Sequence, residues 1–236
     1  ALVDRSPDYG DDEVLDLGAW VGAKVVHIGK GKGEVLQDMG DVDLGDPDTL
    51  AGFLKAGIEA YPADHYGLII SDHGASWPGV GPDETSDGDT LELQEIKAGI
   101  AGGLADTDVD KLDLLGFDAC LMATYEVAGT LAPLADRMIA SSELEPGHGW
   151  DYAAVGTVAD DGATVDELGK AIVDGFLAQA QDNETDADVT LAELDLTRMD
   201  DVEAAMGTLT DALVDRAASV SPVVGRTLAD NPGYGR

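Results

Sequence analysis

One histidine and the only cysteine of this 236-residue chain follow two short apolar runs, and together they could do thiol chemistry. His73 comes shortly after the run at residues 66–71, and Cys120 comes shortly after the run at residues 112–117. A cysteine thiolate can attack a carbonyl carbon, and an imidazole can accept and return the proton. A lone cysteine is more often a small buried hydrophobe, so residue types and spacing alone leave both interpretations open.

The two apolar runs are the elements that must position these side chains. The run at residues 66–71 is continuous, apolar and bounded by turn residues, which is typical of a buried strand, and residues 112–117 are predicted to form the next strand. In open α/β sheets, functional residues gather beyond the carboxyl ends of the strands. If the two runs are neighbouring parallel strands, His73 and Cys120 are predicted to meet at one edge of the sheet.

The rest of the chain alternates between strand patterns and helix patterns. Further strands are predicted at residues 138–142 and 189–194, and a hairpin turn is predicted at residues 30–33. Helices are predicted at residues 46–60, 91–104, 126–134, 164–181 and 199–218. Alternating strands and helices are typical of an α/β sandwich around a mainly parallel sheet, which is the fold class we expect.

The chain is strongly acidic, because 48 Asp and Glu residues stand against 13 Lys and Arg residues, for a formal net charge of -35. The acidic residues are spread along the chain, which indicates an acidic solvated surface rather than an interaction tail. Self-repulsion at this charge destabilises a compact protein at low salt and is associated with halophiles, so we expect a halophilic protein. The lack of a basic stripe disfavours nucleic acid and an anionic membrane surface as partners.

Length and apolar content also bound the architecture. With 44% hydrophobic residues the chain can bury one sizeable core, and its single cysteine excludes an intrachain disulfide. No apolar stretch reaches the roughly 18 residues that a membrane-spanning helix needs. The sequence leaves export undecided, so an extracellular or cell-surface location is a hypothesis.

Several short sequence motifs around His73 and Cys120 occur together and in a fixed order. They occupy residues 44–50, 61–68, 72–77, 83–86, 88–91, 116–123 and 143–150. In these motifs the chain resembles the clostripain-like cysteine peptidases, which share a caspase-like fold with gingipains and caspases. The resemblance implies a caspase-like α/β/α sandwich, in a single peptidase domain over residues 1–236 that is shortened at both ends relative to the family.

The resemblance also implies roles for particular residues. It makes Cys120 the nucleophile and His73 the general base and acid of a cysteine endopeptidase. The backbone amides of Gly74 and Cys120 would form the oxyanion hole, because preorganised donors stabilise developing negative charge. The alternative is a catalytically inactive clostripain-like homologue that acts as a binding module. The short ends favour this alternative, and the presence of both reactive side chains disfavours it.

The resemblance points to substrates with Arg or Lys on the acyl side of the scissile bond. Asp118 matches an acid that holds the basic side chain in relatives, and in an extended backbone it shares a face with Cys120. A second acid can stand at the centre of the Pro-Gly-x-Gly-Trp word, where this chain has His148, and Asp151 is the candidate substitute. We therefore predict a relaxed preference for Arg or Lys. The alternative is that Asp118 caps the following helix.

No cofactor and no metal ligand set is predicted, although calcium stays open because some relatives need it. Residues 83–89 approximate the first positions of a calcium loop, but Gln94 stands where such a loop needs a bidentate Glu. The segment is therefore predicted to be a flexible acidic loop. The expected partner is a protein or peptide substrate, and the oligomeric state is not predicted.

Overall fold

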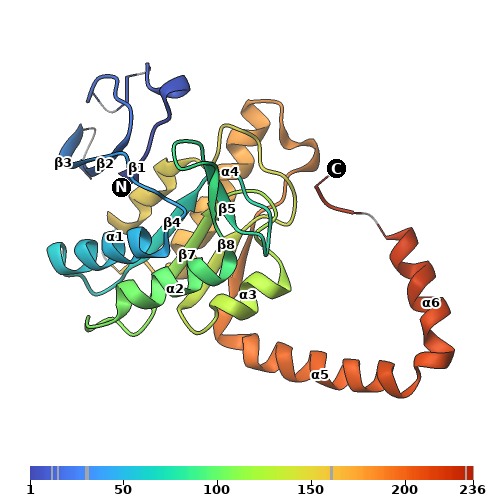
Figure 1. Cartoon of the computed structure of the whole chain (residues 1–236). Coiled ribbons are helices and arrows are strands. Elements are labelled where there is room, and N and C mark those ends of the chain that lie inside the picture. Colours follow the sequence, from blue (N-terminus) through green and yellow to red (C-terminus); the bar gives the residue numbers. More distant parts are fainter. Residues whose placement is uncertain (12, 15, 30–31, 160–161, 232, 236) are drawn as a thin grey trace. The chain divides into compact units, whose positions relative to one another are not determined.

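The computed structural model describes the whole chain except residues 12, 15, 30–31, 160–161, 232 and 236 (Figure 1). The described residues form two compact units. Unit 1 is Ala1–Asp64 with Pro78–Asp110, and unit 2 is His65–Trp77 with Lys111–Arg236. The single peptidase domain over residues 1–236 stays a prediction.

Unit 1 begins with a small antiparallel sheet. Its order is β1-β2-β3, formed by β1 (Leu2–Val3), β2 (Ala23–Gly29) and β3 (Lys32–Gly40). The 3₁₀ helix η1 (Pro7–Tyr9) lies between β1 and β2 in the sequence. β2 and β3 pair as a hairpin, and residues 30–31 of its predicted turn lie outside the described residues.

Unit 1 continues with the helices α1 (Pro47–Ala60) and α2 (Leu93–Leu104), which pack against each other. Asp46 caps α1 by accepting a hydrogen bond from the backbone N–H of Asp48 (2.8 Å), with Pro47 in the first turn, as the sequence predicts. A Cβ atom on Gly99 of α2 would lie 2.8 Å from Cδ2 of Leu50. The glycine therefore sets how closely the two helices approach.

A hairpin of β5 (Val80–Asp83) and β6 (Asp89–Leu91) stands where the sequence predicts a flexible acidic loop. Asp83 closes its turn, because Oδ1 accepts hydrogen bonds from the backbone N–H groups of Thr85 (2.9 Å) and Ser86 (3.2 Å). Burial raises the pKa of Asp83, but these bonds and one from the Leu44 amide outweigh burial and lower the pKa. Within the described residues, no group of three or more His, Cys, Asp or Glu side chains could hold a metal ion.

Unit 2 is built on a four-stranded sheet with the order β4-β7-β8-β9. The strands are β4 (Gly67–Ser71), β7 (Leu112–Asp118), β8 (Ala135–Ala140) and β9 (Ala192–Asp195). β4–β7 and β7–β8 are parallel pairs, as predicted, whereas β9 pairs antiparallel with β8. The register pairs Ser71 with Asp118, so β4 and β7 end side by side.

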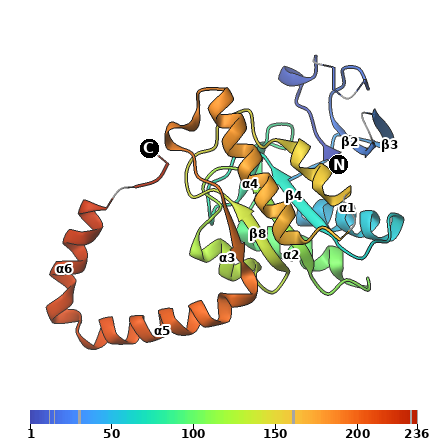
Figure 2. The ribbon, with the colours of Figure 1, turned by 180° about the vertical axis from the view of Figure 1, so that it is seen from behind.

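Helix α4 (Val165–Asp182) covers one face of this sheet, seen from that side in Figure 2. Ile172 and Phe176 of α4 pack in one core cluster with Leu114 of β7, Ile139 of β8 and Trp150. Side chains alternate along a strand, so the neighbours of Leu114 in β7 face away from α4. This cluster fixes the sheet whose edge carries both chemical motifs.

The remaining helices of unit 2 are α3 (Tyr125–Leu131), η2 (Tyr152–Ala159), η3 (Asp186–Asp188), η4 (Leu196–Arg198), α5 (Met199–Asp215) and α6 (Ala217–Asp230). The helix predicted at residues 199–218 thus ends at Asp215, and α6 has no counterpart in the sequence-based prediction. Pro222 lies inside α6, and a proline argues against a helix in any pattern-based prediction. None of the described helices combines the length and apolar character needed to cross a membrane.

Candidate active site

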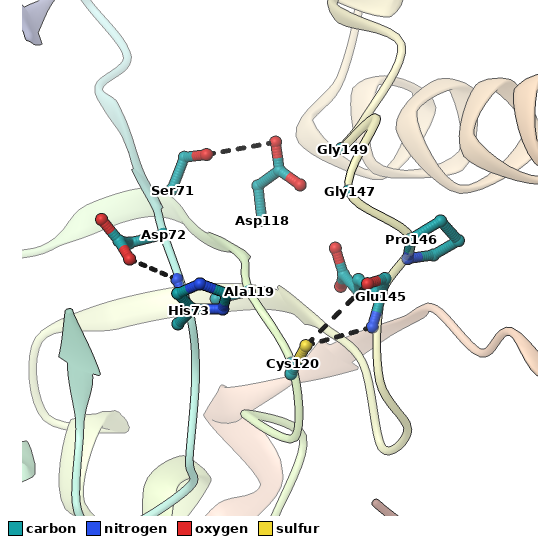
Figure 3. Close-up of a pocket in the computed structure, with 10 residues that line it drawn as sticks. All are labelled: Ser71, Asp72, His73, Asp118, Ala119, Cys120, Glu145, Pro146, Gly147 and Gly149. Carbon is teal, nitrogen blue, oxygen red and sulfur yellow. Dashed lines mark hydrogen bonds between the residues drawn. The ribbon is translucent and has the colours of Figure 1, made fainter. Parts of the chain in front are cut away.

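The loops that follow β4, β7 and β8 form a pocket of about 270 Å³ at the carboxyl edge of the unit 2 sheet (Figure 3). Its lining residues are Ser71, Asp72, His73, Asp118, Ala119, Cys120, Glu145, Pro146, Gly147 and Gly149. The structure therefore brings His73 and Cys120 to the same edge of the sheet. It also places Asp118, the candidate specificity residue, in the same pocket.

Gly74 lets the loop after β4 lie directly against the backbone of Cys120. A Cβ atom on Gly74 would come within 2.2 Å of the Cys120 carbonyl oxygen and 2.9 Å of the Cys120 nitrogen. Any larger residue must therefore push the two loops apart. The close approach places the two backbones expected to supply the oxyanion hole next to each other.

The thiol of Cys120 is half-buried and has a hydrogen-bond donor in the loop after β8. The backbone N–H of Glu145 donates to Sγ (3.2 Å), and Sγ lies 4.0 Å from the Glu145 carbonyl oxygen. These contacts hold the sulfur against the loop after β8. Leu121 has a φ of 64°, an uncommon conformation for a bulky residue, and it turns the chain sharply after Cys120.

Asp118 is buried in the pocket, with only 6% of its surface exposed. Its Oδ2 accepts hydrogen bonds from the backbone N–H of Trp150 (3.2 Å), the hydroxyl of Tyr152 (2.9 Å) and the hydroxyl of Ser71 (3.5 Å). Burial and then the charge of Asp118 raise the pKa of Tyr152, so its hydroxyl stays protonated and donates. No Lys or Arg is among the residues that line the pocket. The pocket therefore presents a carboxylate with no Lys or Arg beside it.

The interpretation of Asp118 as a helix cap is wrong. Helix α3 is capped by Thr124, whose hydroxyl accepts a hydrogen bond from the backbone N–H of Val127 (3.4 Å). Asp118 instead contacts the loop after β8 through its carboxyl group, at a point where Gly149 has a φ of 64°. A Cβ atom on Gly149 would lie 2.9 Å from Oδ2 of Asp118, so glycine is needed at this close approach.

Glu145 is a pocket residue that the sequence patterns did not single out. Its Oε2 accepts a hydrogen bond from the indole N–H of Trp150 (3.1 Å), while its Oε1 is buried without a hydrogen-bond partner among the described residues. Burial, and then the negative charge of Asp118, raise the pKa of Glu145 from 4.5 to about 9. Glu145 is therefore protonated at neutral pH.

The raised pKa of Glu145 makes stability depend on pH. Between about pH 4.5 and pH 9 the folded chain holds a proton that the unfolded chain has lost, so the free energy of unfolding falls as pH rises. Glu145→Gln removes this effect. Its stability relative to the wild type is expected to grow with pH, by up to about 1.4 kcal/mol per unit.

Urea unfolding of both proteins at constant salt, in steps between about pH 5 and pH 8, measures this difference. Glu143→Gln is the matched control, because it removes a carboxyl of the same loop that does not line the pocket. A difference between Glu145→Gln and the wild type that stays flat across this range would contradict the shifted pKa.

Asp151 and His148 do not line the pocket, although the sequence points to this loop for a second acid. Asp151 Oδ1 accepts a hydrogen bond from the backbone N–H of Ala153 (2.9 Å). The His148 ring lies within hydrogen-bonding distance of Gln179 Nε2 (2.9 Å) and Thr185 Oγ1 (3.0 Å). Trp150 and Tyr152 donate hydrogen bonds to Asp118, whereas the carboxyl of Asp151, which stands between them in the sequence, bonds to the backbone of Ala153.

The chain is similar to proteins of one known family. The model of the clostripain family matches residues 24–228. Clostripain from Hathewaya histolytica is 30% identical over 182 residues, which cover 64% of this chain and 34% of that protein. The chain thus spans about a third of this curated relative.

Solved structures show the same fold. A secreted C11 cysteine protease from Bacteroides thetaiotaomicron, "iotapain", has a TM-score of 0.67 at 19% identity, over 80% of this chain and 57% of that chain. An inactive zymogen C11 protease from Parabacteroides distasonis has a TM-score of 0.58 at 21% identity, over 77% of this chain and 49% of that chain. These likenesses confirm the predicted fold class. Because the family model covers well over half of the sequence, this chain belongs to the clostripain family.

Proposed function

We propose that this chain is a cysteine endopeptidase in which Cys120 is the nucleophile and His73 carries the proton. The proposal rests above all on one observation: the only thiol of the chain and His73 line the same pocket. The amide that donates to the sulfur and the close approach of Gly74 support it. Family membership supports the same class of chemistry.

In the proposed reaction, the Cys120 thiolate attacks the carbonyl carbon of the scissile peptide bond. The amides of Gly74 and Cys120 donate to the oxygen that becomes negatively charged. Protonated His73 then gives its proton to the leaving nitrogen, the C–N bond breaks, and a thioester remains on Cys120. A water molecule that loses a proton to His73 hydrolyses the thioester and restores the thiol.

For the substrate, the proposal includes a basic residue on the acyl side of the scissile bond. Support comes from Asp118, a buried carboxylate in a pocket whose lining holds no Lys or Arg. Attraction of a cation is stronger in a partly desolvated pocket than in water. Asp151 lies outside the lining and drops out of this proposal.

A peptide library tests the preference. Arg and Lys are expected to be enriched at the acyl-side position, and Asp118→Asn is expected to reduce that enrichment more than it reduces turnover of neutral substrates. Enrichment of Asp, or of no residue class, would show that the pocket has diverged. Binding of peptides without any turnover would instead support the inactive homologue that acts as a binding module.

We also propose that the protein works at high salt and outside the cell. The net charge of -35 supports the first point, and the description of the solved Bacteroides thetaiotaomicron relative as secreted supports the second. The Debye length falls from about 10 Å at 0.1 M salt to about 3 Å at 1 M, which screens the repulsion between surface carboxylates.

The melting temperature is therefore expected to rise steeply with NaCl concentration, and the chain is expected to need molar salt to fold. Thermal melts between about 0.1 M and 3 M NaCl measure this dependence. A parallel series in sucrose, which is excluded from the protein surface but carries no charge, separates screening from exclusion. A flat NaCl series would remove the inference of a high-salt environment.

A further inference from the structure

The pocket holds two neighbouring carboxyl groups whose hydrogen bonding differs. Asp118 accepts hydrogen bonds from three donors, whereas Glu145 accepts one from Trp150. Oε1 of Glu145 is buried and has no donor among the described residues, and the protonated Glu145 carboxyl hydrogen-bonds to Asp118, which helps to raise its pKa. The Glu145 carboxyl lies on the side of its loop that faces Asp118 and Cys120 (Figure 3). A proton held between two buried carboxyl groups leaves them short of donors, and a ligand that brings N–H donors into the pocket can replace that proton.

We propose that Glu145 is a second specificity-determining residue, which joins Asp118 in holding a cationic substrate side chain and loses its proton to solvent when the cation binds. The inference rests on the proposed function, because it defines how the same pocket takes its substrate.

Charge balance explains why the proton would leave. In the empty pocket the pair carries one negative charge, because burial and the charge of Asp118 keep Glu145 protonated. An ammonium or guanidinium group adds a positive charge and several N–H donors, which stabilises a second carboxylate and gives Oε1 a partner. A neutral side chain offers neither the charge nor the donors. Glu145 would therefore favour cationic side chains over neutral ones.

The groups around Glu145 fit this role. The Tyr152 hydroxyl interacts with both carboxyls, and the Cys120 thiol accepts from the Glu145 amide. His73 and Asp72 belong to the loop after β4, which forms another part of the lining. His73 is thus the one lining side chain that can carry a positive charge, and every other charged group of the lining is an acid.

Other polar residues of the loop after β8 are engaged elsewhere. His148 contacts Gln179 and Thr185, and Glu143 accepts a hydrogen bond from the backbone N–H of Gly235 (2.6 Å). Glu145 is thus the acid that this loop contributes to the pocket lining.

Calorimetry with benzamidine, a small amidinium cation, tests the inference without thiol chemistry. The probe is titrated at pH 7 and constant salt into the full chain carrying Cys120→Ala, once in phosphate and once in Tris. The difference in heat between the two buffers counts the protons released. Close to one proton per bound benzamidine is expected. Adding Glu145→Gln is expected to abolish the release and weaken binding by about 10–100-fold.

Glu143→Gln in the same background is the matched control and is expected to keep both the affinity and the proton release. Absence of benzamidine binding, absence of proton release, or release that persists in Glu145→Gln would each overturn the inference. Peptide turnover by the wild-type chain is measured separately. Turnover of basic substrates without Glu145-dependent proton release would reject this inference alone. Glu145-dependent proton release without any peptide turnover would reject the proposed function alone.

Discussion

Replacement of Cys120 by alanine is expected to abolish peptide hydrolysis, with kcat/KM falling by at least about 10⁴-fold. The chain has no other cysteine, so no second thiol can take over the attack on the carbonyl carbon. His73→Ala is expected to cause a comparable loss, because the pocket lining offers no second imidazole to move the proton. Because residues that act as a unit lose activity together, the double variant should be little worse than either single one.

Steady-state kinetics with a fluorogenic peptide that carries Lys on the acyl side measures these losses. His65→Ala is a useful control, because His65 pairs with Asp113 (2.7 Å) and does not line the pocket. Retained turnover in Cys120→Ala would point to another nucleophile. Additive losses in the double variant would contradict a shared role for the two side chains.

Gly74→Ala is expected to lower kcat by about 10²–10³-fold, the size of effect seen when one oxyanion donor is lost. The added methyl group would sit 2.2 Å from the Cys120 carbonyl oxygen, which is too close for any real contact, so the two loops must separate. Separation displaces the Gly74 amide from the developing oxyanion. The loss is therefore expected in kcat more than in KM.

Gly207→Ala is the matched control, because a Cβ atom there meets nothing within 4 Å and the residue lies on α5. It is expected to leave kcat unchanged. Circular dichroism and melting temperature show whether Gly74→Ala still folds. A folded Gly74→Ala protein with wild-type kcat would rule out the Gly74 amide as an oxyanion donor.

The part of the site that depends on strand ends could be predicted from the sequence. β4 and β7 are largely apolar runs that stop at polar residues, and parallel neighbours end at the same edge of a sheet. His73 and Cys120 therefore had to come together once the two runs paired. The helix start at Asp46 was equally readable, because the cap and the following proline are local signals.

The choice of the second acid could not be predicted in the same way. Glu145 and Asp151 lie in the same segment after β8, and the sequence alone does not show which of the two acids lines the pocket. The outcome depends on the positive φ of Gly149 and on the hydrogen bond from the Trp150 backbone N–H to Asp118, which joins segments far apart in the sequence. The β5–β6 hairpin was not predicted for a similar reason. Asp83 accepts a hydrogen bond from the backbone N–H of Leu44, a residue distant in the sequence, and local sequence patterns do not show such a contact.

Labelling of the chain with peptidyl acyloxymethyl ketones tests the central claim most directly. These reagents alkylate a thiolate that is activated next to a bound peptide. In high salt, the reagent with Lys on the acyl side is expected to label Cys120 rapidly, with one added mass per chain. The Asp reagent should label it slowly, and His73→Ala should slow labelling by both reagents, because the thiol loses its proton acceptor. Equal rates with Lys and Asp reagents, or labelling that does not depend on His73, would contradict a thiol peptidase with an acidic pocket.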